Sequence, residues 1–168
     1  DPKRVDWNDV WFASRKLDGV RCITIVDYQG NVKSYSRVGN EFETLQVVKD
    51  AIKSLGVVGV VFDGEICLMD KDGNEDFQGI MKQIKRKNHT MDNPRYVIFD
   101  YLSLKEFDTK VGTRSLISRL YDIEEKRVTL QESNILSVLP QIRVKDVEHL
   151  NDMIAEADKA GYEGIMLR

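Results

Sequence analysis

The pattern of apolar and polar positions predicts short strands joined by turns in the first part of the chain. Residues 11–16 and 20–27 are rich in apolar and β-branched side chains, which is typical of strands. The polar segment 28–31, which contains Gly30, predicts a turn. Residues 32–37 then return as a hairpin partner of the second strand.

Longer apolar runs predict buried strands further along the chain. Residues 57–62 form a continuous apolar run, which residues 63–65 interrupt and residues 66–69 continue. Residues 70–73 predict a turn. The remaining predicted strands cover residues 95–102, with a break at Asp100, and residues 134–138 and 165–168.

Apolar residues at helical spacing predict several helices between these strands. The clearest covers residues 44–55, in which apolar side chains recur every three or four positions before Gly56. The other predicted helices cover residues 76–87, residues 113–130 with Thr113 as N-cap, and residues 146–160 with Gly161 as the C-terminal stop.

The order of these elements favours an α+β fold with antiparallel β-sheets flanked by helices. Strands outnumber helices, and many are joined by short turns, so a regular alternation of strand and helix is not expected. A length of 168 residues fits one domain. The chain has no initial Met and stops within its last predicted strand, so we expect residues 1–168 to be a domain truncated at both ends.

Composition and charge bear on nucleic-acid binding, on the state of the cysteines and on membrane association. The net charge of −3 gives no overall basic footprint for nucleic acid, although a local basic patch would suffice. Cys22 and Cys67 lie in apolar runs and are interpreted as reduced core thiols of an intracellular protein. No apolar run approaches the length that crosses a bilayer, and the polar N-terminus has no signal-peptide pattern, so no membrane association is expected.

Charged residues interrupt the predicted strands at four places. These are Lys16-Leu17-Asp18-Gly19, Asp63-Gly64-Glu65, Asp100 and Glu163-Gly164. Buried strands do not accept charge cheaply, so the four interruptions suggest strand ends that converge on a charged ligand. A glycine beside an acid would allow the backbone to approach that ligand.

Lys16 is the candidate nucleophile. A lysine amine attacks only in its neutral form, which burial or neighbouring cations favour, and Arg21, Arg37 or a metal ion could supply that charge. Such an amine attacks either a carbonyl carbon or phosphorus. The arginines and carboxylates of the chain favour phosphorus, since they suit phosphates and a hard metal ion. The chain has no Gly-rich Walker loop.

Five segments, in this order, resemble the motifs of the covalent nucleotidyltransferases, and most closely those of the ATP-dependent DNA ligases. The segments are Lys16–Arg21 (K-L-D-G-V-R), Ser36–Glu41 (S-R-V-G-N-E), Phe62–Glu65 (F-D-G-E), Tyr96–Tyr101 (Y-V-I-F-D-Y) and Glu163–Arg168 (E-G-I-M-L-R). Asp76–Gln78 followed by Lys85–Lys87 is similar to a further ligase segment. The resemblance implies an adenylation domain with an ATP-grasp-like covalent nucleotidyltransferase core.

The resemblance also implies a reaction. Lys16 would attack the α-phosphate of ATP and release pyrophosphate, leaving AMP on the lysine. The AMP would pass to the 5′-phosphate of a nick in duplex DNA, and the neighbouring 3′-hydroxyl would then displace it and seal the strand. ATP, Mg²⁺ or another divalent cation, and nicked double-stranded DNA are the implied cofactors and partner. Nick sealing serves DNA replication, repair and recombination, and we expect a monomer.

Matching motif positions imply individual roles beside that of the nucleophile Lys16. The residues implied to bind the nucleotide or nick are Arg15, Arg21, Arg37, Glu65, Phe99, Glu163 and Arg168. Among them, Arg21 would contact the ribose, Phe99 would stack on adenine, and Arg37 would contact a phosphate or the nick. Glu65, which would also contact the ribose, and Glu163 are the implied metal ligands.

The chain departs from the family pattern at two positions. Ser14 stands where ligases often carry Glu or Gln, and Arg168 stands where the last motif usually ends in Lys. A planar guanidinium and a compact ammonium are not equivalent. The K-x-K strand and the oligonucleotide-binding-fold domain that normally follow are not among these residues.

Alternatives stay open at this point. An RNA ligase or an mRNA capping guanylyltransferase would use the same lysine chemistry. A non-catalytic nucleic-acid-binding module could keep the fold alone. The basic residues within 82–87 fit either a solvated helix face or a contact to the DNA backbone. His89 and His149 have no paired Cys/His spacing, so no zinc site is predicted.

Overall fold

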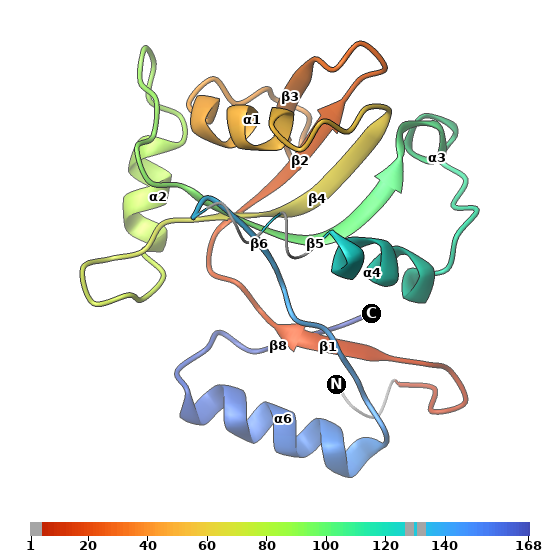
Figure 1. Ribbon diagram of the computed structural model, residues 1–168. Coiled ribbons are helices and arrows are strands. Elements are labelled where there is room, and N and C mark those ends of the chain that lie inside the picture. Colours follow the sequence, from red (N-terminus) through yellow and green to blue (C-terminus); the bar gives the residue numbers. More distant parts are fainter. Residues whose placement is uncertain (1–4, 127–129, 131–133) are drawn as a thin grey trace. The chain divides into compact units, whose positions relative to one another are not determined.

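A computed structural model describes residues 5–126, 130 and 134–168 (Figure 1). The chain divides into two compact units. The smaller unit combines residues 1–18 with 139–168, and the larger unit consists of residues 19–138. Among the described residues, no helix has the length and apolar character needed to cross a lipid bilayer.

The larger unit is built on a five-stranded sheet with the strand order β3-β2-β4-β5-β6 (Figure 1). Its strands are β2 (Val20–Val26), β3 (Val32–Ser36), β4 (Val60–Cys67), β5 (Arg95–Ser103) and β6 (Leu136–Val138). The β2–β3, β2–β4 and β4–β5 pairs are antiparallel, as predicted. β6 pairs parallel to β5, because the long helical connection between them returns the chain in the same direction.

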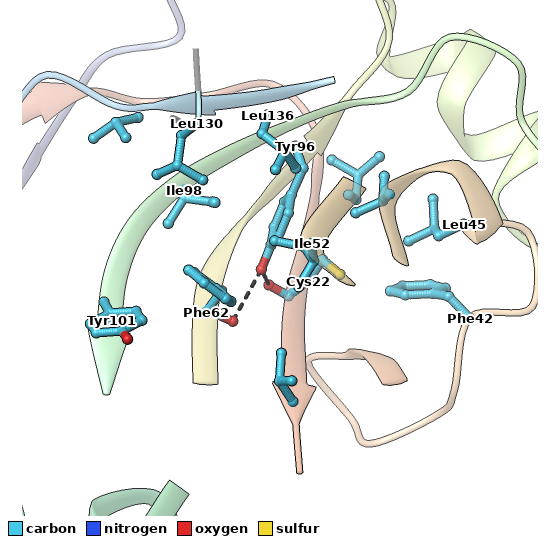
Figure 2. Close-up of a cluster of buried hydrophobic side chains, with 14 of the residues drawn as sticks. Cys22, Phe42, Leu45, Ile52, Phe62, Tyr96, Ile98, Tyr101, Leu130 and Leu136 are labelled. Atoms are coloured by element: carbon cyan, nitrogen blue, oxygen red, sulfur yellow. Dashed lines mark hydrogen bonds between the residues drawn. The ribbon is translucent and has the colours of Figure 1, made fainter. Parts of the chain in front are cut away.

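Helices α1 (Gln46–Lys53), α2 (Phe77–Gln83), α3 (Leu104–Thr109) and α4 (Leu116–Glu125) belong to the same unit. Apolar side chains of three of them pack against the sheet in one hydrophobic core, to which α1 contributes Val48 and Ile52, α2 contributes Ile80 and α4 contributes Ile123. Figure 2 shows this core and the residues that several strands and α1 contribute to it.

Tyr96 lies at the centre of this core. Its ring is fully buried, and its hydroxyl donates a hydrogen bond shared between the carbonyl oxygens of Cys22 and Phe62, each 3.0 Å away (Figure 2). The ring needs the space beside Gly64, where a Cβ atom would lie 2.5 Å from the Val97 carbonyl oxygen and 2.7 Å from the Tyr96 ring. The buried hydroxyl therefore joins neighbouring strands with its hydrogen-bonding capacity satisfied.

The smaller unit contains a three-stranded sheet with the order β7-β1-β8 and one helix. Its elements are β1 (Phe12–Arg15), β7 (Ile142–Arg143), α6 (Val147–Lys159) and β8 (Ile165–Leu167). Both strand pairs are antiparallel. Ala13, Val144 and Leu150 form a separate core, against which Trp11 and Leu167 pack among others.

Some predicted boundaries were wrong. The predicted breaks at residues 63–65 and at Asp100 do not occur. β4 and β5 are each continuous there, because a β-bulge opposite Asp63 and Gly64 keeps the two strands paired on both sides. The helix predicted to begin after Thr113 begins at Leu116, and the Ser115 side chain caps it. Its predicted end partly lies outside the described residues. α3 and β7 were not predicted.

Candidate active site

Lys16 and Glu163 form an ion pair in the smaller unit, although they are 147 residues apart in the sequence. β1 and β8 pair with Arg15 opposite Ile165, and the Lys16 amide donates a 2.8 Å hydrogen bond to the Gly164 carbonyl. The Lys16 and Glu163 side chains are 42% and 48% exposed. The end of this sheet therefore presents a half-exposed amine together with a carboxylate.

Arg15 is the last residue of β1, and Arg168 bonds to the backbone of its first residue, Phe12. The Arg15 guanidinium carbon lies 5.1 Å from the centroid of the Tyr162 ring, within cation–π range. The Arg168 amide and carbonyl both hydrogen-bond the backbone of Phe12, at 3.0 and 2.9 Å. The sheet thus brings Arg15 and Lys16 close to Glu163, whereas Arg168 lies at the other end of the β1–β8 pairing, opposite Phe12.

Arg21, Asp63 and Phe99 form a second cluster, which lies in the larger unit. Arg21 Nε donates to Asp63 Oδ1 at 2.6 Å, and Nη2 donates to Oδ2. This hydrogen bonding raises the pKa of the Arg21 guanidinium, so its charge is fixed. The guanidinium carbon lies 5.0 Å from the Phe99 ring centroid. Asp63 therefore holds a cation over the face of an aromatic ring that is only 6% exposed.

The bulge in the sheet explains the position of Phe99. Asp63 pairs with Asp100, but Gly64 pairs with Ile98, so Phe99 is the extra residue on β5. Ile98 belongs to the hydrophobic core. A bulge re-aims side chains next to it, and here it places the Phe99 ring beside the guanidinium of Arg21 on the next strand but one.

Glu65 lies opposite Arg21 in the β2–β4 pairing and accepts a 3.2 Å hydrogen bond from the Gly19 amide. That glycines beside these acids let the backbone approach a ligand stays a prediction, and the fold itself also requires Gly19 and Gly64. A Cβ atom on Gly19 would collide with the carbonyl oxygen of Ile66 on β4. These glycines are needed because neighbouring strands lie close.

A pocket of about 640 Å³ opens in the larger unit. It is lined by Arg21 and Glu65, by the turn that carries Arg37, by segment 40–44, by the Phe77 and Met81 side chains of α2, and by residues 84–87. Arg37 is exposed on its turn. The pocket thus combines three of the predicted binding residues, Arg21, Arg37 and Glu65, with the basic segment Lys85–Lys87 and an apolar wall.

The sequence was also compared with known proteins. Residues 4–168 match the family model described as the ATP dependent DNA ligase domain. The chain belongs to this family.

Curated relatives of this ligase domain include the multifunctional non-homologous end joining protein LigD of Pseudomonas aeruginosa. The two are 27% identical over 93% of this chain and 18% of the relative. A DNA ligase of Archaeoglobus fulgidus is 28% identical over 91% of this chain and 27% of the relative. The chain therefore spans less than a third of the length of these curated relatives.

Solved structures with the same fold include the ATP-dependent DNA ligase of bacteriophage T7 in complex with ATP. Its TM-score is 0.73 at 18% identity, over 95% of this chain and 56% of that one. The Chlorella virus DNA ligase-adenylate has a TM-score of 0.69 at 20% identity, over 100% of this chain and 55% of that one. The likeness confirms the predicted α+β fold and its assignment to the ligase nucleotidyltransferase core.

The carboxylates of this ligase domain fit a divalent cation that is shared with a substrate. Mg²⁺ usually takes one or two protein carboxylates and completes its shell with water and substrate phosphates. Glu65 and Glu163 are such donors. In the described part of the chain, no three His, Cys, Asp or Glu side chains gather as a metal site. Glu65 in the larger unit and Glu163 in the smaller unit each offer one such carboxylate, which suits a cation that completes its shell with nucleotide and water.

Asp63 was not predicted as an individual site residue. The motif signal was present, since Asp63 stands in Phe62–Glu65, but no role was given to it. Its bond to Arg21 depends on the register of β2 and β4, which places Asp63 diagonally across from Arg21. Phe77 and Met81 were also missed as pocket residues, because an exposed apolar helix face is visible only in the fold.

Proposed function

We propose that this domain carries out nucleotide transfer in an ATP-dependent DNA ligase, with Lys16 as the residue that accepts AMP. The observation that carries the proposal is the Lys16–Glu163 pair, which joins the first and last of the five ligase-like segments at the end of one sheet. Membership of the ligase family supports the same chemistry.

In the first step, the neutral Nζ of Lys16 attacks the α-phosphorus of ATP. A P–N bond forms, the bond to the β-phosphate oxygen breaks, pyrophosphate leaves, and the amine loses a proton to solvent. In the structure the Lys16 amine is engaged in the ion pair with Glu163, so the pair must open before attack. The half-exposed position of both side chains makes such opening feasible.

The AMP group then moves to the nick. An oxygen of the 5′-phosphate attacks the lysyl-AMP phosphorus, which forms a P–O–P linkage and returns the Lys16 amine. The 3′-hydroxyl next attacks the 5′-phosphate, so that a phosphodiester bond forms and AMP leaves. The arginines can hold phosphates bidentately during these transfers. Bound Mg²⁺, with Glu65 or Glu163 among its ligands, would neutralise phosphate charge.

The larger unit supplies the binding groups in this proposal. Arg21, fixed by Asp63 over Phe99, and Glu65 would receive the nucleoside, while Arg15 and Arg168 would contribute charge from the smaller unit. Arg37 and residues 85–87 give the pocket a basic rim suited to the backbone of nicked DNA. The end-joining name of the Pseudomonas relative makes DNA repair the process that we infer first.

The test is incubation of the full-length protein with α-labelled ATP and Mg²⁺. We expect covalent label on the protein that K16A abolishes. K33A is the matched control, because Lys33 is also an exposed lysine near a carboxylate, Glu41, at 3.8 Å, and this variant should keep the label. Label from GTP instead of ATP would indicate a capping enzyme. A preference for nicked RNA would indicate an RNA ligase. The absence of label from either nucleotide would indicate a non-catalytic binding module.

A further inference from the structure

Thr44 makes two hydrogen bonds that the proposed chemistry does not use. Its side chain is buried, with the residue 1% exposed. The Thr44 hydroxyl donates to the Ile84 carbonyl at 2.8 Å, and the Thr44 carbonyl accepts from the Met91 amide at 2.9 Å. One residue thus bonds to two points of the chain that lie seven positions apart.

The first bond completes the end of α2. The last carbonyls of a helix have no partner within the helix, and Ile84 is the C-cap residue of α2. The Thr44 hydroxyl satisfies the Ile84 carbonyl in a buried position, where an unpaired carbonyl would be costly. A valine in place of Thr44 would keep the shape of the side chain and remove this bond.

The two bonds enclose the basic segment. Ile84 and Met91 are both buried in the hydrophobic core, whereas Lys85, Arg86 and Lys87 between them are exposed. Thr44 therefore ties down both ends of a short, exposed, positively charged loop. Within that loop, the Arg86 amide donates to the Gln83 carbonyl at 3.0 Å, which continues the turn of the helix.

The same bonds fix the two walls of the pocket relative to each other. Thr44 belongs to the segment that lines one wall together with Arg37, and residues 84–87 line the other. One acid that lines the pocket, Glu41, is already within 4 Å of both Lys33 and Lys49, so its charge is shared with these two lysines. Cations on both walls can then meet a phosphate backbone that enters the pocket.

We propose that Thr44 is a positioning residue for the nicked duplex, acting by holding Lys85, Arg86 and Lys87 in place at the pocket. The inference rests on the proposed function, since it assigns the DNA-binding part of that function to this loop. A loop that is ordered before binding avoids the entropic cost of ordering during binding. Each phosphate contact that forms also releases counterions, which makes binding salt-dependent.

The experiment compares T44V and T44S with a matched control, T24V, in the full-length protein. Thr24 is also a fully buried threonine of the larger unit, and its hydroxyl bonds to Ser34 at 2.9 Å, away from the pocket residues. Affinity for a nicked DNA duplex is measured over a range of salt concentrations. Formation of lysyl-AMP is measured separately, without DNA.

T44V should bind the nicked duplex about tenfold more weakly, a change of about 1.4 kcal/mol, with a smaller salt slope. Its loss of duplex affinity should exceed any loss in its yield of lysyl-AMP. T44S, which keeps the hydroxyl, should bind within about twofold of the wild type. T24V should bind the duplex as the wild type does, since it leaves the loop anchored.

Wild-type affinity in T44V would overturn the inference, and so would an equal loss in T44S, because the hydroxyl would then not be responsible. If T44V does not fold, amide hydrogen exchange of the wild-type protein tests the inference instead. Binding of nicked duplex should slow the exchange of the Met91 amide at least about threefold. An unchanged exchange rate would overturn the inference. Absence of lysyl-AMP in the wild type would instead contradict the proposed function.

Discussion

At the scale of single residues, Asp63 determines where the Arg21 guanidinium lies. Its two oxygens hold both Nε and Nη2 of Arg21 above the Phe99 ring. A bidentate pair of this kind restricts the guanidinium more than a single contact would. The arginine is therefore placed before any nucleotide arrives, and the placement depends on a residue that need not touch the nucleotide.

D63N should raise the KM for ATP in lysyl-AMP formation by about tenfold, because the neutral amide releases the guanidinium at a cost of the order of 1.4 kcal/mol. The measurement is the yield of labelled protein as a function of ATP concentration. D100N is the control, since Asp100 makes a similar pair with Arg119 at 2.7 Å. An unchanged KM in D63N, or an equal rise in D100N, would contradict this role.

Cys22 gives a second prediction at this scale. Burial raises the pKa of its thiol to about 12. The thiolate fraction at pH 8 is then roughly a thousandfold below that of an ordinary cysteine. An alkylating reagent should leave Cys22 unmodified in the native protein and modify it after denaturation, as peptide mapping by mass spectrometry would detect. Rapid native labelling would show that the core around Tyr96 opens.

Lys16 and Glu163 could be selected from the sequence because each belongs to a charged segment with a glycine that interrupts the predicted strands. Their pairing could not be predicted from spacing alone, since it depends on which strand β8 joins. The position of Phe99 required the bulge, and bulges leave no reliable signal in a single sequence. The roles of these residues stay predictions until the labelling experiment is done.

At the scale of elements, a buried charge cluster joins α3, α4 and the end of β5. Glu106 is 4% exposed and accepts hydrogen bonds from Ser103, Thr113 and Arg114. Arg114 also pairs with Asp122 of α4. Hydrogen bonds from Arg114, chiefly, hold the pKa of the Glu106 carboxyl well below its usual range.

E106Q should lower the free energy of unfolding by about 3 kcal/mol near pH 7, because it leaves part of a buried ion pair unmatched. A depressed pKa stabilises the fold above the pKa of the unfolded carboxyl, and this contribution is lost as the pH falls. The difference between E106Q and the wild type should therefore shrink below about pH 4.

Urea unfolding monitored by circular dichroism at several pH values measures this difference. E125Q, on an exposed position of α4, should stay within about 0.5 kcal/mol of the wild type. A difference in E106Q that persists unchanged at pH 3 would contradict an ionic origin.

Two elements were missed for different reasons. α3 had a readable signal, because Ser103 and Glu106 form a capping box at its start, but its six residues were too few to show helical periodicity. β7 is a two-residue strand with exposed side chains, so no apolar pattern marks it. The parallel pairing of β6 is a property of the whole connection, which local patterns do not determine.

At the scale of the whole molecule, each unit has its own hydrophobic core. The core of the larger unit contains residues from α1, α2 and α4, whereas the smaller core rests on Ala13, Val144 and Leu150 with a few partly buried neighbours. The sequence contains two tryptophans, Trp7 and Trp11, and both belong to the smaller unit. Their fluorescence therefore reports on that unit alone.

Tryptophan fluorescence should lose its native signal at a lower denaturant concentration than far-UV circular dichroism, because the smaller core buries less apolar surface. The W7F variant leaves Trp11, which packs in the smaller core, as the single reporter. Coincident transitions by both probes would indicate one cooperative unit instead.

β1 ends at the residue before Lys16, and it pairs with β7 and β8, which are formed by residues much later in the sequence. A nascent chain leaving the ribosome therefore exposes β1 long before either partner has been made. The lysine meets its carboxylate only once translation has passed residue 163. The Lys16–Glu163 pair therefore forms only late in synthesis, and a chain that terminates before residue 163 cannot form it.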